Sequence, residues 1–154
     1  MVLWRISNHL DLEGYGGQRG DARWHTAAPD KRIVYFAEHP ALALVEILVN
    51  LRAHRDFLPE KFQLLRVDLP QAIQTLRIAE DSLDGNWREN LTETQAIGNE
   101  WLKLRKTALL AVPSAPAPES WNYLWNPLHS DAASVSIAWS KWIRYDRRLF
   151  RLSE

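Results

Sequence analysis

The side chains that could do chemistry together in this chain are gathered in residues 16–50. Glu46 is the one charged residue of an otherwise apolar segment, and a carboxylate is costly to bury unless another group pairs with it or uses it. Arg19 and Arg23 belong to a glycine-rich stretch, where guanidinium and backbone N–H groups could approach an anion. Together with Tyr35, these arginines and the sequestered glutamate form the best functional lead in the sequence.

A predicted strand and a predicted helix would position these groups. Residues 33–36 have the β-branched and aromatic content of a buried strand. Pro40 suits the first turn of a helix, and residues 41–52 are predicted to continue it. The chain therefore predicts a β–α unit that carries Tyr35 on its strand and Glu46 on its helix.

The rest of the sequence predicts one α+β domain over residues 1–154, with a mixed β-sheet and flanking helices. A second helix is expected at residues 92–106, with Thr92 as its N-cap and Gln95 in the capping-box position. Residues 121–129 are interpreted as a polar-aromatic segment with a turn, and the signals between residues 70 and 92 are mixed. Further strands are predicted at residues 2–6, 62–69, 108–112 and 135–139.

The composition narrows the classes of function. Nineteen basic residues balance nineteen acidic ones, which gives no indication of nucleic-acid or membrane binding. The sequence has no cysteine, which excludes disulfides and thiolate chemistry and fits a reducing compartment. His25, His39 and His54 are scattered without metal-ligand spacing, so we expect no metal site. With no signal peptide and no run near the ~18 apolar residues of a membrane span, we expect a cytoplasmic protein.

Seven short motifs occur in one order that resembles the RES-domain toxins, and the resemblance covers nearly the whole chain. The motifs are Trp4-Arg5-Ile6, Gly20-x-x-Arg23-Trp24, Val34-Tyr35, Ala43-x-x-Glu46, Leu110-x-Val112-Pro113-Ser114, Asn126-Pro127-x-His129 and Tyr145-Asp146-x-Arg148-Leu149. The resemblance implies a toxin of a type II toxin–antitoxin pair with an ADP-ribosyltransferase-like fold. It implies destruction of NAD⁺ as substrate, by hydrolysis or by phosphorolysis with inorganic phosphate as co-substrate, and no further cofactor. It also implies neutralisation by an Xre-like helix-turn-helix antitoxin, and a homodimer within the complex.

The same resemblance implies roles for single residues. The arginine of the family name falls on Arg23, with Arg5 as a second basic contact, and the glutamate falls on Glu46. Tyr35 matches the active-site tyrosine of the family. The serine is assigned to Ser114, with Ser134 and Ser136 as alternatives.

The chemistry of NAD⁺ cleavage suits these residue types. The transition state is oxocarbenium-like and the nicotinamide leaving group needs no proton, so a pre-organised carboxylate such as Glu46 is the useful catalyst. Tyr35 could stack on nicotinamide or ribose, while Arg5 and Arg23 match the phosphate oxygens of the diphosphate. Ser114 could hydrogen-bond the ribose or the carboxamide.

The sequence departs from the family pattern after Arg23-Trp24, where the family has Asn and then Gly. Here His25 follows, and then residues 26–29, which predicts a different path for this loop. Two other functions stay open: mono-ADP-ribosyl transfer to a protein, and a non-catalytic binding module with a tryptophan-rich surface. Trp121 or Trp125 is a candidate anchor for the antitoxin.

Overall fold

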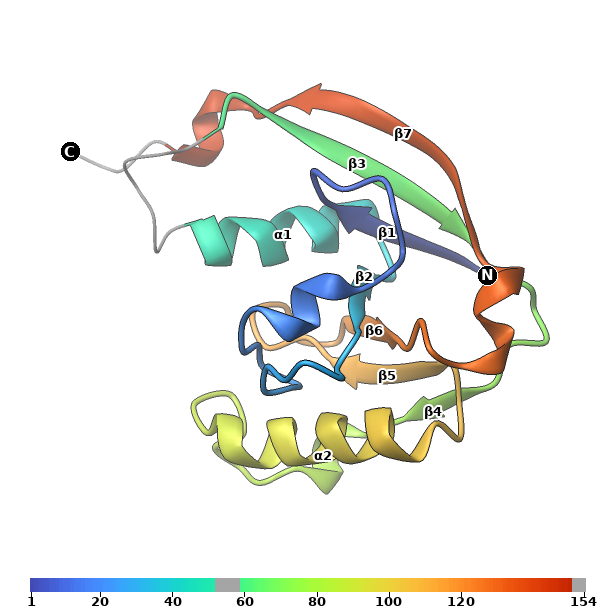
Figure 1. The fold of residues 1–154 in the computed structure, drawn as a ribbon. Helices are drawn as coiled ribbons and strands as arrows, with labels where there is room; N and C mark the ends of the chain where they lie inside the picture. Colours follow the sequence, from blue (N-terminus) through green and yellow to red (C-terminus); the bar gives the residue numbers. More distant parts are fainter. Residues whose placement is uncertain (52–58, 151–154) are drawn as a thin grey trace.

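A seven-stranded mixed sheet organises the computed structural model, which describes residues 1–51 and 59–150 (Figure 1). The strand order is β4-β5-β6-β2-β1-β3-β7; β4 and β5 run parallel, and the other neighbouring pairs run antiparallel. The strands are β1 (Val2–Ile6), β2 (Val34–Ala37), β3 (Lys61–Asp68), β4 (Thr75–Arg77), β5 (Leu109–Pro113), β6 (Trp121–Trp125) and β7 (Ser136–Arg144). The predicted α+β class and mixed sheet are confirmed.

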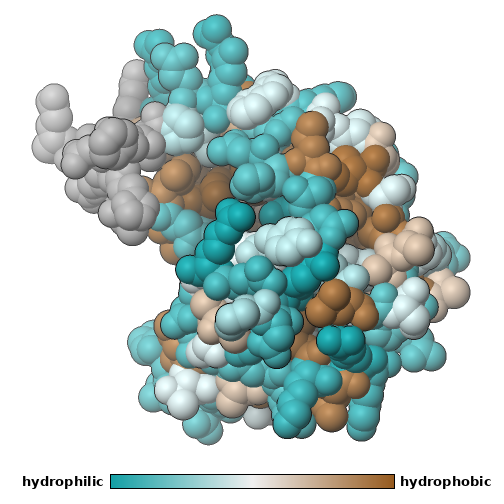
Figure 2. Space-filling model, in the orientation of Figure 1, coloured by the Kyte–Doolittle hydropathy of each residue, from teal (hydrophilic) through white to brown (hydrophobic). Residues whose placement is uncertain are grey.

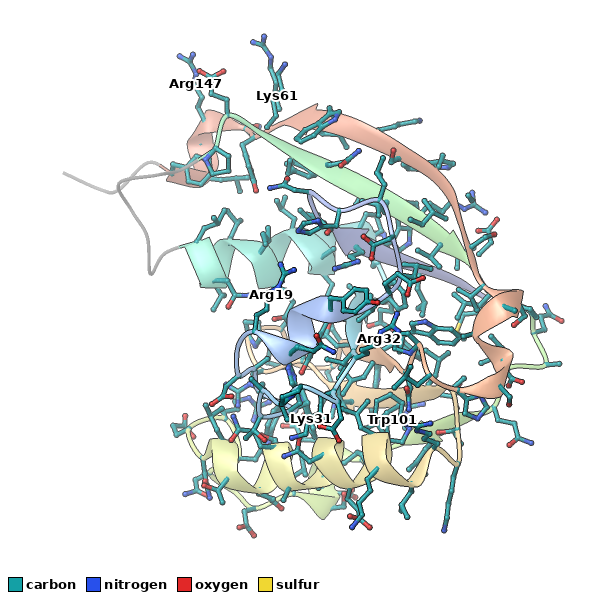
Figure 3. All side chains as sticks on the ribbon, viewed as in Figure 1. Arg19, Lys31, Arg32, Lys61, Trp101 and Arg147 are labelled. Carbon is teal, nitrogen blue, oxygen red and sulfur yellow. The ribbon has the colours of Figure 1, made fainter. Side chains whose placement is uncertain are left out.

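Two helices, α1 (Pro40–Leu51) and α2 (Leu91–Leu104), pack against the same face of this sheet. Helix α1 buries Leu42 and Ala43 against Ala37 of β2, while α2 packs Trp101 against Leu110 and its neighbours. Strand alternation places Ala37, Tyr35 and their partners on β6 on this helix-covered face. In Figure 1 the two helices lie apart along the sheet, α1 near β1 and α2 near β4 and β5. Figure 3 shows the Trp101 side chain lying between α2 and the strands.

The opposite face of the sheet forms a second core. Its buried members include Leu3, Val34, Phe36, Val67 and Trp125. Each is adjacent in its strand to a residue that faces the helices, so its side chain points to the other face. Trp125 is 1% exposed, so it is part of this core and is not available to anchor an antitoxin.

The start of α2 differs from the sequence prediction. Asn90 is the N-cap, and its side chain accepts a hydrogen bond from the Thr92 backbone N–H. Thr92 therefore lies inside the first turn, and Gln95 does not close a capping box but donates to the backbone of Ala22. The helix begins earlier because asparagine serves as an N-cap as well as threonine does.

Strands β2, β3 and β5 are each shifted by one residue from their predicted bounds, β7 is longer than predicted, and β4 and β6 lie where no strand was predicted. The interpreted polar-aromatic segment contains β6, which is paired on both sides by β2 and β5. Strand β7 extends to Arg144 because it pairs along the whole of β3. Strand β4, in the stretch with mixed signals, is short and exposed, and its parallel pairing with β5 holds it in the sheet. The last predicted residue of the first helix, Arg52, lies outside the described residues.

Hydrophilic residues cover much of the face seen in Figure 2, with apolar patches between them. Within residues 1–51 and 59–150, no helix is long and apolar enough to cross a membrane.

Candidate functional site

One carboxylate oxygen of Glu46 receives two side-chain hydrogen bonds. Ser114 Oγ donates to Glu46 Oε1 over 2.7 Å, and Asn122 Nδ2 donates to the same atom over 2.5 Å. Ser114 follows the end of β5 and is held there by a bond from the Ala117 backbone N–H to its hydroxyl. Among the described residues no hydrogen bond engages Glu46 Oε2.

Tyr35 lies on the same face of the sheet as Asn122, because Ala37, two residues along β2, pairs with Asn122. The Tyr35 hydroxyl meets His25 Nδ1 at 2.8 Å. Burial raises the pKa of Tyr35 well above its ordinary value, so the phenol keeps its proton. Burial, with the charge of Lys31, lowers the pKa of His25, which favours the neutral imidazole. A neutral His25 can accept a hydrogen bond from the Tyr35 hydroxyl at Nδ1.

Arg23 approaches the same cluster from the loop before β2. Its guanidinium donates to the Trp87 carbonyl over 3.2 Å and lies 5.7 Å from the centroid of the Trp87 ring. Burial lowers the pKa of Arg23, and the largest opposing influence is attraction by the Glu46 carboxylate, followed by that of Glu89. The Arg23 guanidinium and the Glu46 carboxylate therefore attract each other although they come from different elements.

Helix α2 holds the loop that carries Arg23. Thr94 Oγ1 donates to the Arg23 carbonyl over 2.6 Å, and Gln95 Nε2 donates to the Ala22 carbonyl over 2.9 Å. Gly98 lets the loop approach this closely, because a Cβ at that position would lie 1.7 Å from the Trp24 carbonyl oxygen. These contacts fix the backbone of a segment that would otherwise be free to move.

The structure does not bring Arg5 to this cluster. Strand alternation turns Arg5 with Leu3 toward the face opposite the helices, and its guanidinium donates to the Asp11 carbonyl over 3.0 Å. Two backbone amides of the glycine-rich stretch are already hydrogen-bonded within the protein. The N–H groups of Gly17 and Arg19 donate to backbone carbonyls within a 3₁₀ turn.

Of the three serines considered from sequence, only Ser114 contacts Glu46 among the described residues. Ser134 is exposed and donates to the Asp131 carbonyl, and Ser136 is exposed on β7. Sequence reasoning did not assign a role to Asn122. The sequence around Asn122 gives little indication of a functional role, because a single asparagine between aromatic residues suggests a turn as readily as a strand.

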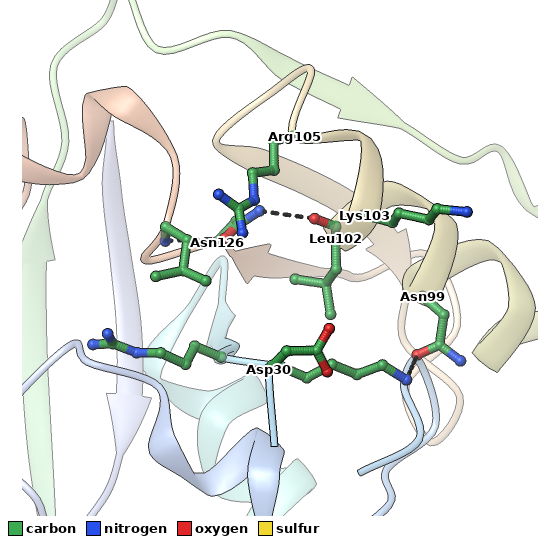
Figure 4. A pocket seen from close by; sticks show the side chains of 9 residues that line it. Asp30, Asn99, Leu102, Lys103, Arg105 and Asn126 are labelled. Carbon is green, nitrogen blue, oxygen red and sulfur yellow. Dashed lines mark hydrogen bonds between the residues drawn. The ribbon is translucent and has the colours of Figure 1, made fainter. Parts of the chain in front are cut away.

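A basic hollow of about 170 Å³ lies at the C-terminal end of α2 (Figure 4). Lys103 and Arg105 line it, and both suit the partial negative charge at the end of a helix. Lys31 is already bonded to Asn99 over 2.8 Å there. The Asn126 backbone N–H donates to the carbonyl of Ala108, just before β5, and Ser114 directly follows β5. The length of β5, about 16 Å of strand, therefore separates the hollow from the Glu46 cluster.

A second hollow, of about 360 Å³, lies elsewhere, between residues 10–13 and residues 132–137. Within the described part of the chain, no group of three or more His, Cys, Asp or Glu side chains could hold a metal ion. The absence of a metal stays a prediction for the whole chain.

Comparison with solved structures defines the class of fold first. The chain is similar to a chain in the crystal structure of the Mycobacterium tuberculosis MbcT-MbcA toxin-antitoxin complex, with a TM-score of 0.70 and 18% sequence identity. The match covers 93% of this chain and 84% of that one. The two chains share a fold.

The family follows from the sequence comparison. The chain belongs to the RES-domain family, whose profile matches residues 2–147. It is 39% identical over 137 residues to "Toxin Res" of Pseudomonas putida, covering 89% of this chain and 92% of the relative. It is 34% identical over 162 residues to a "Prs ADP-ribosylating toxin" of a Sphingobium species, covering 97% and 96%.

Proposed function

We propose that this chain is the toxin of a toxin–antitoxin pair and that it degrades NAD⁺ by cleaving the bond between nicotinamide and ribose. The observation that carries the proposal is the Glu46 carboxylate, which is oriented through one oxygen by Ser114 and Asn122 while Arg23 lies within electrostatic reach. The relatives named toxins and the shared fold support the toxin role.

In the proposed reaction the glycosidic C–N bond breaks and its electron pair leaves with nicotinamide. The positive charge that develops on the ribose is stabilised by the free oxygen of Glu46, which is already oriented and therefore needs little reorganisation. Water or inorganic phosphate then attacks the ribose carbon, and an attacking water loses a proton. Ser114 and Asn122 hold Glu46, while Tyr35 offers its ring for stacking on nicotinamide or ribose.

The protonation states of Tyr35 and Arg23 suit the roles proposed for them beside Glu46. Because the pKa of Tyr35 is raised by burial, its hydroxyl remains protonated and acts through its ring and hydrogen bonds rather than as a base. Arg23 supplies positive charge for the phosphates of NAD⁺. The site needs no further cofactor in this proposal.

Replacing Glu46 with Gln tests the proposal directly. The substitution keeps the shape and removes the charge, so we expect NAD⁺ to fall rapidly in cells that produce the native chain and to stay near its starting level with the variant. Loss of a single electrostatic contribution of this kind lowers turnover by about 10²–10³-fold. Growth arrest that persists in the variant, with NAD⁺ unchanged, would instead favour the non-catalytic binding module.

The second candidate function is mono-ADP-ribosyl transfer to a protein, and one relative favours it because it is named an ADP-ribosylating toxin. The two candidates share the cleavage step and differ in the acceptor. Purified chain with NAD⁺, with and without inorganic phosphate and with no other protein, separates them: release of nicotinamide with free ADP-ribose supports glycohydrolysis, and ADP-ribose 1″-phosphate formed only with phosphate supports phosphorolysis. Nicotinamide release that requires added protein and labels that protein would support transfer.

We also propose that an Xre-like helix-turn-helix antitoxin neutralises the chain by covering the Glu46 cluster and withholding NAD⁺. The solved structure with the same fold is a complex of a toxin with its antitoxin. A half-buried Trp121, with Arg77 stacked on its ring at 3.6 Å, lies one residue from Asn122 and could be reached by such a partner.

A further inference from the structure

Two guanidinium groups lie over the ring of one buried tryptophan, Trp87. The Cζ atom of Arg88 is 4.6 Å from the centroid of the ring, and that of Arg23 is 5.7 Å from it. The ring itself is 2% exposed, so it forms a rigid support for both cations. Because both cations lie against one ring, the charge of Arg88 contributes to the lowered pKa of Arg23.

Arg88 also borders the Glu46 cluster. Its Nε donates to the carbonyl of Ala115 over 3.3 Å, and Ala115 follows Ser114, whose hydroxyl donates to Glu46. Arg23 shares the Trp87 ring with Arg88, and the Glu46 carboxylate attracts it. Both arginines therefore lie at the edge of the group of residues that would act on the ribose.

The carboxylates near the two arginines are ones with which an anionic ligand can compete. Arg88 pairs with Glu80 over 2.5 Å, and the two side chains are 33% and 40% exposed, so solvent weakens this pair and an anionic ligand can compete with it. No salt bridge to Arg23 is found within residues 1–51 and 59–150. Two guanidinium groups on one tryptophan match the bidentate geometry of a diphosphate, which must compete with Glu80 for Arg88 and with the attraction of Glu46 and Glu89 for Arg23.

We propose that Arg23 and Arg88, supported by Trp87, form the subsite that binds the diphosphate. Arg88 then has the role of second basic contact that the sequence suggested for Arg5. The inference rests on the proposed function for its substrate and names a residue that neither the motif pattern nor the comparisons single out. Arg5 lies on the other face of the sheet, so it does not share a ligand with Arg23.

Calorimetric titration of the full chain with ADP and with adenosine tests the subsite without requiring turnover. We expect Arg88→Gln to weaken ADP binding by about tenfold to a hundredfold, because charge-assisted hydrogen bonds to phosphate are lost. Adenosine binding should not change. Arg66→Gln is the matched control, since Arg66 is an exposed arginine on β3 that pairs with Asp68 over 2.9 Å. Arg5→Gln should likewise leave ADP binding unchanged.

Several results would overturn the subsite: ADP binding by Arg88→Gln as tight as by the native chain, equal losses for ADP and adenosine, or a loss that follows Arg5→Gln instead. Arg88→Lys keeps the charge without the planar fork, and an intermediate loss for ADP alone would support the subsite if the Gln variant folds poorly.

The outcome separates this inference from the proposed function. If the native chain consumes NAD⁺ but Arg88→Gln leaves its KM for NAD⁺ unchanged, the subsite is wrong and the function stands. If ADP binding depends on Arg88 but NAD⁺ survives incubation with the native chain, the subsite stands and the proposed function is wrong.

Discussion

At the scale of single residues, the site depends on how one carboxylate is held. Glu46 Oε1 accepts from both Ser114 and Asn122, and no hydrogen bond engages its second oxygen among the described residues. The two donors come from different strands, so the glutamate on α1 is tied to β5 and β6 at once. Because both donors act on one atom, their contributions should not be independent.

We expect Ser114→Ala and Asn122→Ala each to lower kcat/KM for NAD⁺ by about tenfold or more, the usual loss for one hydrogen bond to a charged group. The double variant should lose less than the product of the two single losses, since the first substitution already frees the carboxylate to rotate. Steady-state kinetics on the four proteins measure this coupling. Strictly multiplicative losses would argue against a shared role in orienting Glu46.

His25 gives the protein a dependence on pH. Its folded pKa lies below the ordinary value of 6.5, mainly because of burial and secondarily because of Lys31. The unfolded chain therefore binds a proton more readily, so the contribution of His25 to stability is complete above the unfolded pKa and is lost as pH falls toward the folded pKa. Protonation would also remove the Nδ1 lone pair that faces the Tyr35 hydroxyl.

We expect the free energy of unfolding of the native chain to fall between about pH 7.5 and about pH 5.5, and His25→Asn to reduce that fall. Urea unfolding at the two pH values measures both. Comparison with the variant separates His25 from the other titrating groups. An identical pH dependence in the two proteins would show that His25 titrates in the folded chain as it does in the unfolded one.

At the scale of elements, α2 acts as a platform for the Arg23 loop. One side of the helix presents Thr94, Gln95, Gly98 and Asn99 to the loop, and the three polar side chains hydrogen-bond its backbone. The spacing of three to four residues puts Thr94, Gln95, Gly98 and Asn99 on neighbouring turns of one helix face. The orientation of Arg23 is therefore determined by a helix about seventy residues later in the chain, as the separation of 71 residues in the bond from Thr94 shows.

Gly98→Ala tests this platform. Alanine favours a helix over glycine by about 1 kcal/mol, but its Cβ would lie 1.7 Å from the Trp24 carbonyl oxygen, so the loop must move. We expect the clash to outweigh the helix preference and to destabilise the fold by about 1–3 kcal/mol. NAD⁺ consumption should fall further than stability alone explains, because Arg23 moves with the loop.

Urea unfolding and NAD⁺ consumption, measured together, check this prediction. Glu100→Ala, at an exposed position of the same helix, is the control and should change neither quantity appreciably. A more stable and fully active Gly98→Ala variant would contradict the close packing of loop and helix.

At the scale of the whole molecule, the residues of the site come from several helices, strands and loops of the domain. Glu46 comes from α1, Ser114 and Asn122 from the ends of β5 and β6, and Arg23 from a loop on α2. A ligand that binds this assembly, and not the unfolded chain, must stabilise the whole domain.

Glu46→Gln allows this to be measured without turnover. At a ligand concentration near 100 times the Kd, we expect ADP-ribose to add about 2.7 kcal/mol to the free energy of unfolding and to raise Tm by several degrees. Thermal unfolding with and without ADP-ribose measures the shift. Stabilisation by the antitoxin but not by ADP-ribose would favour the binding-module function.

The features that the sequence predicted well are local. Tyr35 on a strand and Glu46 on the following helix are both found, because β-branched and apolar runs of these lengths have few other structures available to them. The pairing of Glu46 with Ser114 also agrees with the residues singled out by the family resemblance. The sequence prediction was wrong for β6 and for the N-cap of α2. In both places the local sequence is compatible with two structures: a strand or a turn for β6, and Asn90 or Thr92 as the N-cap of α2.

What only the tertiary structure decided is which distant groups meet. Asn122 donates to Glu46 across 76 residues of sequence, and no local pattern encodes that distance. Arg5 was separated from Arg23 by the alternation and pairing of β1, while Arg88 was brought to Trp87 and the Ser114 turn by packing. The sequence alone determined the types of residue that could act on NAD⁺ and the elements that carry them. Their arrangement around one carboxylate depended on long-range strand pairing and helix packing, which are properties of the folded chain as a whole.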